Sequence, residues 1–202
     1  EGALKTYTYI GVGREDGKTK GEYSPIFYKK QKYKLLKSNT FWLSETPQIV
    51  SKGWDASLER ICTYGLFQNK KTGDKVWVFN THFDHRGTLA RAKSVDLITE
   101  KVKTLNQEGL PTIITGDFNL TPFTQPIQKM QSNFDDVQKN LPQSDPYYGT
   151  SNGFDTEKNA EHRIDYIFIK NLQTKNAKHI YKKTPMGGWA SDHHPVIAIL
   201  DN

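Results

Sequence analysis

The chain has 202 residues, of which 35% are hydrophobic, and its 10 Phe, 10 Tyr and 4 Trp can supply one large core. Its 28 Lys and Arg against 22 Asp and Glu give a net charge of +6 without a polybasic block, which favours an anionic substrate only mildly. The single cysteine, Cys62, excludes an internal disulfide framework and a cysteine zinc cluster, and no apolar run approaches the ~18 residues of a membrane-spanning helix. We therefore expect one domain over 1–202, a monomer with no membrane span.

Seven segments predict short β-strands, because each is rich in β-branched and aromatic residues and most end in polar ones. In chain order they are TYTYIGVG (6–13), SPIFYKK (24–30), ERICTYGLF (59–67), DKVWVFNTHFDH (74–85), PTIITGDFN (111–119), RIDYIFIK (163–170) and PVIAIL (195–200). Strands therefore dominate the predicted structure.

Helices are fewer. Apolar residues recur at spacings of three and four across 88–107, which predicts an amphipathic helix, and a weaker helical pattern covers 123–131. The Gly-, Asp-, Lys- and Asn-rich stretches 14–22 and 140–162 predict surface loops, since strands resume on both sides. Many strands with a few covering helices indicate an α+β or layered α/β domain.

Four of the predicted strand ends carry clustered polar side chains. These are His82, Asp84 and His85 in NTHFDH, Asp117 and Asn119 in GDFN, Asp165 in RIDYIF, and Asp192, His193 and His194 in SDHHP. Each set alone is commonplace, because Asp and Asn form turns after strands and an Arg-Ile-Asp run fits a buried ion pair. Four such sets at strand ends, where loops converge, indicate a functional site.

The residue types favour phosphoester chemistry over acyl transfer. No Ser or Cys directly precedes or follows a His in the sequence, and Cys62 lies inside an apolar strand, so a nucleophilic Ser or Cys is poorly supported. Carboxylates, an amide and imidazoles suit Mg²⁺ or Mn²⁺ and can stabilise charge on a phosphate oxygen. We therefore expect hydrolysis of a phosphoester by an activated water.

Taken together and in order, seven motifs resemble the endonuclease/exonuclease/phosphatase superfamily, which has the DNase I-like fold. They are GREDGKTKGEYSPIFY, FWLSETP, GWDASLER, NTHFDH, TGDFN, RIDYIF and SDHHP, and the likeness is greatest to a little-characterised bacterial branch. The resemblance implies an α/β fold, a layered two-sheet β-sandwich flanked by helices, with the site where loops meet at one edge.

The resemblance also implies residue roles. Asp117 would orient or deprotonate the attacking water, with Asn119 holding that carboxylate and touching the phosphate. His193 would contact the phosphate with Asp165 as its partner, and His82 would be a second phosphate-facing imidazole with Glu22 as its carboxylate partner. Asp192 would bind the metal. Arg14 is expected to contact the substrate, and Trp189 is as much a candidate for stacking on it as for packing.

Other polar and aromatic residues have structural interpretations. Asp84, His85 and Arg86 are expected to form a turn, and His194, which precedes a proline, is expected to shape its loop. Trp42 and Trp54 are expected to pack in the core or at its rim. Arg60 and Arg91 are expected to make ion pairs.

One departure from the family pattern affects the metal site. Family members open with a strand ending in Asn, a helix, and a strand ending in Gln-Glu, whose Glu is the principal metal ligand, and this sequence begins after that point. The resemblance therefore implies that the first strands are missing, and a phosphate-ligand or protein binding module without catalysis is the alternative function. Nucleic acid, a phospholipid head group and a sugar phosphate all remain open as substrates. A secreted or periplasmic location is expected only if a signal precedes Glu1.

Overall fold

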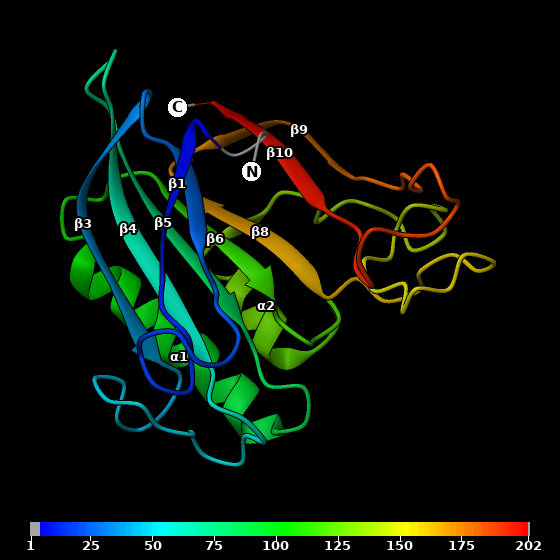
Figure 1. Ribbon diagram of the computed structural model, residues 1–202, viewed down its shortest axis with the longest axis horizontal. Helices are drawn as coiled ribbons and strands as arrows, with labels where there is room; N and C mark the ends of the chain where they lie inside the picture. Colours follow the sequence, from blue (N-terminus) through cyan, green and yellow to red (C-terminus); the bar gives the residue numbers. More distant parts are fainter. Residues whose placement is uncertain (1–4, 202) are drawn as a thin grey trace.

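A mixed six-stranded sheet forms the centre of the computed structural model, which describes residues 5–201 (Figure 1). Its strand order is β3-β4-β5-β6-β8-β7. The strands are β3 (Tyr33–Trp42), β4 (Ile61–Asn69), β5 (Lys75–His82), β6 (Thr112–Asp117), β8 (Asp165–Lys170) and the short β7 (Asp135–Asp136). All neighbours are antiparallel except β5 and β6, which run parallel and are joined by a helical crossover, as a parallel connection requires.

Two helices, α1 (Thr88–Leu105) and α2 (Gln125–Gln131), cover one face of this sheet (Figure 1). Helix α1 packs Val95, Ile98 and Val102 into a core shared with sheet residues such as Phe79 and Ile114. The predicted helices at 88–107 and 123–131 are thus confirmed. Two backbone N–H groups in the first turn of α1 donate to the Asp55 carboxylate, which satisfies donors that a helix start leaves open.

The opposite face of the sheet carries two hairpins. One consists of β1 (Tyr7–Ile10) and β2 (Ile26–Lys29), and the other of β9 (Gln173–His179) and β10 (Val196–Asp201). Strand β2 contacts β4 and β5, whereas β10 contacts β8. The expected layered architecture is confirmed, but within residues 5–201 the second layer consists of two separate two-stranded sheets.

All seven predicted strands are present, but β3, β9 and the two-residue β7 were not predicted. Strand β3 is an edge strand in which most residues before Phe41 are partly or fully exposed, so its sequence lacks a clear apolar alternation. Strand β9, with the sequence QTKNAKH, has Ala177 as its one apolar residue and is held by its pairing with β10. In both strands, pairing with a neighbour outweighs local propensity.

Candidate functional site

The register of the central sheet brings three of the predicted site residues together. His82 ends β5, Asp117 ends β6 and Asp165 begins β8. His82 is the register partner of Asp117, and Asp117 is the register partner of Asp165. Because side chains alternate across a sheet and Thr81 and Tyr166 are buried on the helix side, these three side chains point to the face that carries the hairpins.

Gly116 permits this close approach of β5 and β6. Its φ of +152° lies in a region that side chains rarely adopt, and a Cβ atom there would lie 2.1 Å from the carbonyl oxygen of Thr81. Any other residue would push the two strands apart. The glycine of the GDFN motif therefore sets the distance between Asp117 and the end of β5.

His193, in the loop before β10, joins His82, Asp117 and Asp165, and these four residues form the cluster. Its Nδ1 lies 2.8 Å from Oδ2 of Asp165, and its backbone forms an isolated bridge with Ser151. Ligand atoms of Asp117, Asp165 and His193 all lie within 4.8 Å of one another. The motifs GDFN, RIDYIF and SDHHP thus converge on one place, as their positions at strand ends predict.

Asn119 fixes the Asp117 carboxylate through its backbone. Its N–H donates to Asp117 Oδ1 at 2.8 Å, and its side-chain amide donates to the Phe83 carbonyl at 3.0 Å. Asn119 has a φ of +49°, a conformation that asparagine tolerates better than most residues. Oδ2 of Asp117 lies 3.3 Å from His82 Nε2 and faces the cluster.

Glu22 lies beside His82, and Arg14 in turn lies beside Glu22. His82 Nδ1 lies 3.5 Å from Glu22 Oε2, and the same oxygen lies 2.6 Å from Arg14 Nη1. Arg14 is buried, so the structure places its guanidinium against Glu22, although the sequence suggested a substrate contact for it. Glu22 lies where its predicted partnership with His82 requires.

Arg60, expected only to make an ion pair, links Glu22 to the neighbouring loop. Its side chain is 4% exposed, with Nε 3.5 Å from Asp84 Oδ2, Nη2 3.1 Å from His85 Nδ1 and Nη1 3.9 Å from Glu22 Oε2. The sequence signal that could have predicted this role is the position of Arg60 directly before the apolar segment that forms β4. Arg91, expected to form an ion pair, instead donates to the Asp84 carbonyl oxygen.

Asp84 builds the turn that the sequence predicts. It is 1% exposed and accepts four backbone N–H bonds, from Ser57, Leu58, Arg86 and Gly87. Burial alone would raise the pKa of its carboxyl, but the four donors together hold that pKa well below its usual range. Asp84 is therefore a buried structural anion.

Burial and neighbouring charges shift the pKa values of the cluster residues in different directions. Burial, followed by the negative charge of Asp165, raises the pKa of Asp117 to about 6. The hydrogen bond to Asp165 raises the pKa of His193 to about 8, whereas burial and the charge of Arg60 lower the pKa of His82 to about 4. Near pH 7 the cluster therefore holds an ionised Asp117, a protonated His193 and a neutral His82.

Three other residues considered from the sequence, Asp192, Trp189 and His194, lie in the same segment as His193. Asp192 is exposed, its Oδ1 accepts from the Ser191 hydroxyl, and it is outside the close group of Asp117, Asp165 and His193. Trp189 is half-buried, and its Nε1 donates to the Asp155 carbonyl at 2.7 Å. His194 is buried and stacks on Tyr181 at 3.7 Å between ring centroids, so it shapes the loop as expected.

A cavity of about 420 Å³ opens over the cluster. Its floor is formed by β5, β6 and β8, and its walls by residues just before β2 and just before β10. Candidate residues that line it are His82, Asp117, Asp165 and His193. It has room for a phosphate group and part of the molecule that carries it.

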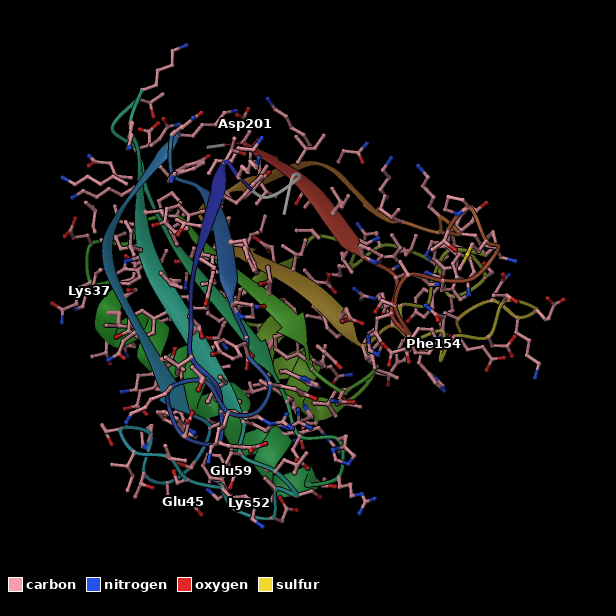
Figure 2. All side chains as sticks on the ribbon, in the orientation of Figure 1. Lys37, Glu45, Lys52, Glu59, Phe154 and Asp201 are labelled. Atoms are coloured by element: carbon pink, nitrogen blue, oxygen red, sulfur yellow. The ribbon has the colours of Figure 1, made fainter. Side chains whose placement is uncertain are left out.

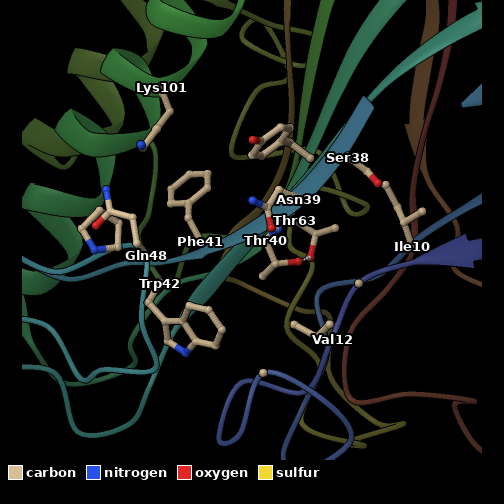
Figure 3. Close-up of a pocket in the computed structure, with 14 residues that line it drawn as sticks. Ile10, Val12, Ser38, Asn39, Thr40, Phe41, Trp42, Gln48, Thr63 and Lys101 are labelled. Carbon is tan, nitrogen blue, oxygen red and sulfur yellow. Dashed lines mark hydrogen bonds between the residues drawn. The ribbon is translucent and has the colours of Figure 1, made fainter. Parts of the chain in front are cut away.

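A second cavity, of about 560 Å³, lies elsewhere (Figure 3). Figure 3 shows Thr40, Phe41 and Trp42 of β3 on one side of it, with Ile10 and Val12 on the other. No titratable member of the cluster lines this cavity, so the smaller one is the candidate active site.

The donor set fits a hard divalent cation. Asp117 and Asp165 face each other as register partners, and their mutual repulsion contributes to the raised pKa of Asp117. A divalent cation would relieve this repulsion, and Mg²⁺ or Mn²⁺ characteristically binds one or two carboxylates together with water. Asp192 is one residue from His193 and could add a third carboxylate.

Comparisons with known proteins find a family model and solved structures that resemble this chain. A model of the Endonuclease/Exonuclease/phosphatase family matches residues 22–193. A mannosyl-6-phosphatase from Bacteroides thetaiotaomicron is 41% identical, with 99% of this chain and 79% of that chain covered and a TM-score of 0.89. A functionally unknown conserved protein from Enterococcus faecalis is 32% identical over 98% of this chain and 78% of that one, with a TM-score of 0.88. The catalytic domain of human Nocturnin, at 18% identity over 97% of this chain and 72% of that one, shares the fold with a TM-score of 0.74.

Proposed function

Since the chain belongs to the endonuclease/exonuclease/phosphatase family, we propose that it hydrolyses phosphoester bonds with Mg²⁺ or Mn²⁺, by in-line attack of an activated water on phosphorus. The observation that carries this proposal is the convergence of His82, Asp117, Asp165 and His193 on the 420 Å³ cavity. A purely structural cluster would not need two facing carboxylates beside a cavity, because their repulsion destabilises the fold.

Asp117 acts on the attacking water. One of its oxygens is fixed by the Asn119 N–H, while the other faces the cluster, so the carboxylate has a set orientation toward the cavity. With a pKa of about 6 it is mostly ionised at neutral pH yet basic enough to accept a proton.

His193 and His82 bind the phosphate in different protonation states. The imidazolium of His193, held by Asp165, stabilises the negative charge that develops on a phosphate oxygen. Neutral His82 is oriented between Glu22 and Asp117 and offers one N–H donor. A bound Mg²⁺ or Mn²⁺ would add Lewis-acid stabilisation, with Asp117, Asp165 and Asp192 as its candidate ligands.

Among the three substrate classes, we favour a sugar phosphate monoester. The Bacteroides thetaiotaomicron relative at 41% identity bears the name mannosyl-6-phosphatase. Nucleic acid and phospholipid head groups are the competing substrates.

The test is an assay with Mg²⁺ or Mn²⁺ on mannose 6-phosphate, a dinucleotide and phosphocholine, with and without EDTA. Asp117→Asn and His193→Ala should each lower kcat/KM by roughly 10²–10⁴-fold. Asp74→Asn, an exposed acid outside the cluster, is the matched control and should behave like the wild type. Equal rates in wild type and Asp117→Asn would refute catalysis by this cluster. Saturable phosphate binding without turnover would instead favour the binding module.

A further inference from the structure

Phe154 has two properties that stability does not explain. Its side chain is 61% exposed, and its φ of +63° lies in the left-handed region that favours glycine. A non-glycine residue in this region usually stores strain, and such strain is concentrated at ligand sites. Because the ring is largely exposed, core packing cannot offset this strain.

Hydrogen bonds fix the Phe154 loop to the segment that carries His193. The N–H groups of Asn152 and Gly153 both donate to the Asp192 carbonyl oxygen, at 2.7 and 3.1 Å. The Asn152 side-chain amide donates to the Ser191 carbonyl at 3.2 Å, and Ser151 pairs with His193 itself. Asn152 Oδ1 also accepts the Phe154 N–H at 2.7 Å, which holds the unusual turn in place. The position of Phe154 is thus set relative to the catalytic imidazole.

The other aromatic rings of this region are engaged in packing. Trp189 donates to the Asp155 carbonyl and contacts Tyr181 and His194 edge-on, and Tyr181 donates to the Gly149 carbonyl. Through the hydrogen bond of Trp189, these packed rings contact the loop that carries Phe154. Figure 2 shows Phe154 among the loops at the right of the view.

We propose that Phe154 determines substrate specificity, as an aromatic platform for the pyranose ring of the sugar phosphate whose phosphate binds at His193. This inference rests on the proposed function for the phosphate position. The apolar C–H face of a pyranose can pack on a phenyl ring without a directional hydrogen bond. The platform therefore recognises the ring and leaves phosphate binding to the cluster.

The test is calorimetric binding of three probes in the presence of Mg²⁺: mannose 6-phosphate, glycerol 3-phosphate, which has no ring, and inorganic phosphate. Phe154→Ala and Phe154→Gly should weaken mannose 6-phosphate binding about three- to tenfold and leave the other two probes unchanged. Phe154→Trp should restore the affinity. Phe123→Ala is the matched control, because that phenyl ring is 63% exposed but has ordinary backbone geometry.

The thermal midpoint separates this role from a structural one. Phe154→Gly removes the strain at φ +63°, so its midpoint should equal or exceed that of the wild type while its sugar-phosphate affinity falls. A lower midpoint, equal weakening of all three probes, or unchanged mannose 6-phosphate binding would each overturn the proposal. A loss specific to adenosine monophosphate would assign the platform to a nucleobase and also overturn it. If the Phe154 variants lose only mannose 6-phosphate binding while the wild type shows no turnover, the platform is supported and the proposed hydrolysis is refuted.

Discussion

Replacing Asp165 with Asn should change the charge of His193 at neutral pH. The Asp165 carboxylate accepts a hydrogen bond from His193 Nδ1 at 2.8 Å, and this bond is the largest cause of the rise in the His193 pKa from 6.5 to about 8. An amide in its place carries no charge, so the pKa should fall back toward 6.5. At pH 7.5 the protonated fraction would then drop from roughly three quarters to roughly one tenth.

The same pair contributes to stability, with a defined pH dependence. A rise of 1.5 pKa units corresponds to about 2 kcal/mol of unfolding free energy. Because the folded state holds the proton more tightly, this contribution is fully present below pH 6.5 and is lost as the pH rises through 8. The wild type should therefore lose about 2 kcal/mol from this pair between pH 6 and pH 9, and Asp165→Asn should not.

The assay is an NMR titration of the His193 ring without divalent ions, combined with urea unfolding at pH 6 and pH 9. Asp192→Asn is the matched control, because its charge also raises the His193 pKa but only as a lesser cause. It should therefore lower that pKa less than Asp165→Asn does. If His193 titrates near 8 in Asp165→Asn, or near 6.5 in the wild type, the reasoning fails.

Three further predictions concern stability, each measured by urea unfolding. Asp117→Asn should raise the unfolding free energy by up to about 3 kcal/mol at pH 8, since ionising a carboxyl with a pKa of about 6 destabilises the folded state above that pH; no gain at pH 8 would contradict this. Gly116→Ala should cost about 2–5 kcal/mol, because its Cβ would meet the Thr81 carbonyl at 2.1 Å, and wild-type stability would refute the assigned geometry. Arg163→Met should cost about 3–5 kcal/mol, since it leaves buried Asp136 without the guanidinium that bonds both its oxygens, and adding Asp136→Asn should recover part of the loss.

The sequence by itself identified the family, the candidate site residues and most of the elements. The periodic apolar residues of α1 and the apolar runs that became β4, β5, β6 and β8 are local signals, because each element must bury one face whatever its neighbours are. Carboxylates, an amide and imidazoles at strand ends are also visible locally. Sequence order alone could not show that His82, Asp117 and Asp165 share one end of one sheet, since that depends on strand pairing.

The tertiary structure determined the distances between the site residues, their interaction partners and their protonation states. The raised pKa of Asp117 and the lowered pKa of His82 arise from burial and from charges distant in the sequence, such as those of Asp165 and Arg60. Arg60 is 38 residues from Glu22 along the chain, yet the two approach to 3.9 Å. Strand β9 likewise exists because β10 pairs with it, not because its own residues favour a strand. Residue type and local period are encoded locally, whereas register, desolvation and long-range charge exist only once the chain has folded, because they are properties of residues brought together from separate segments.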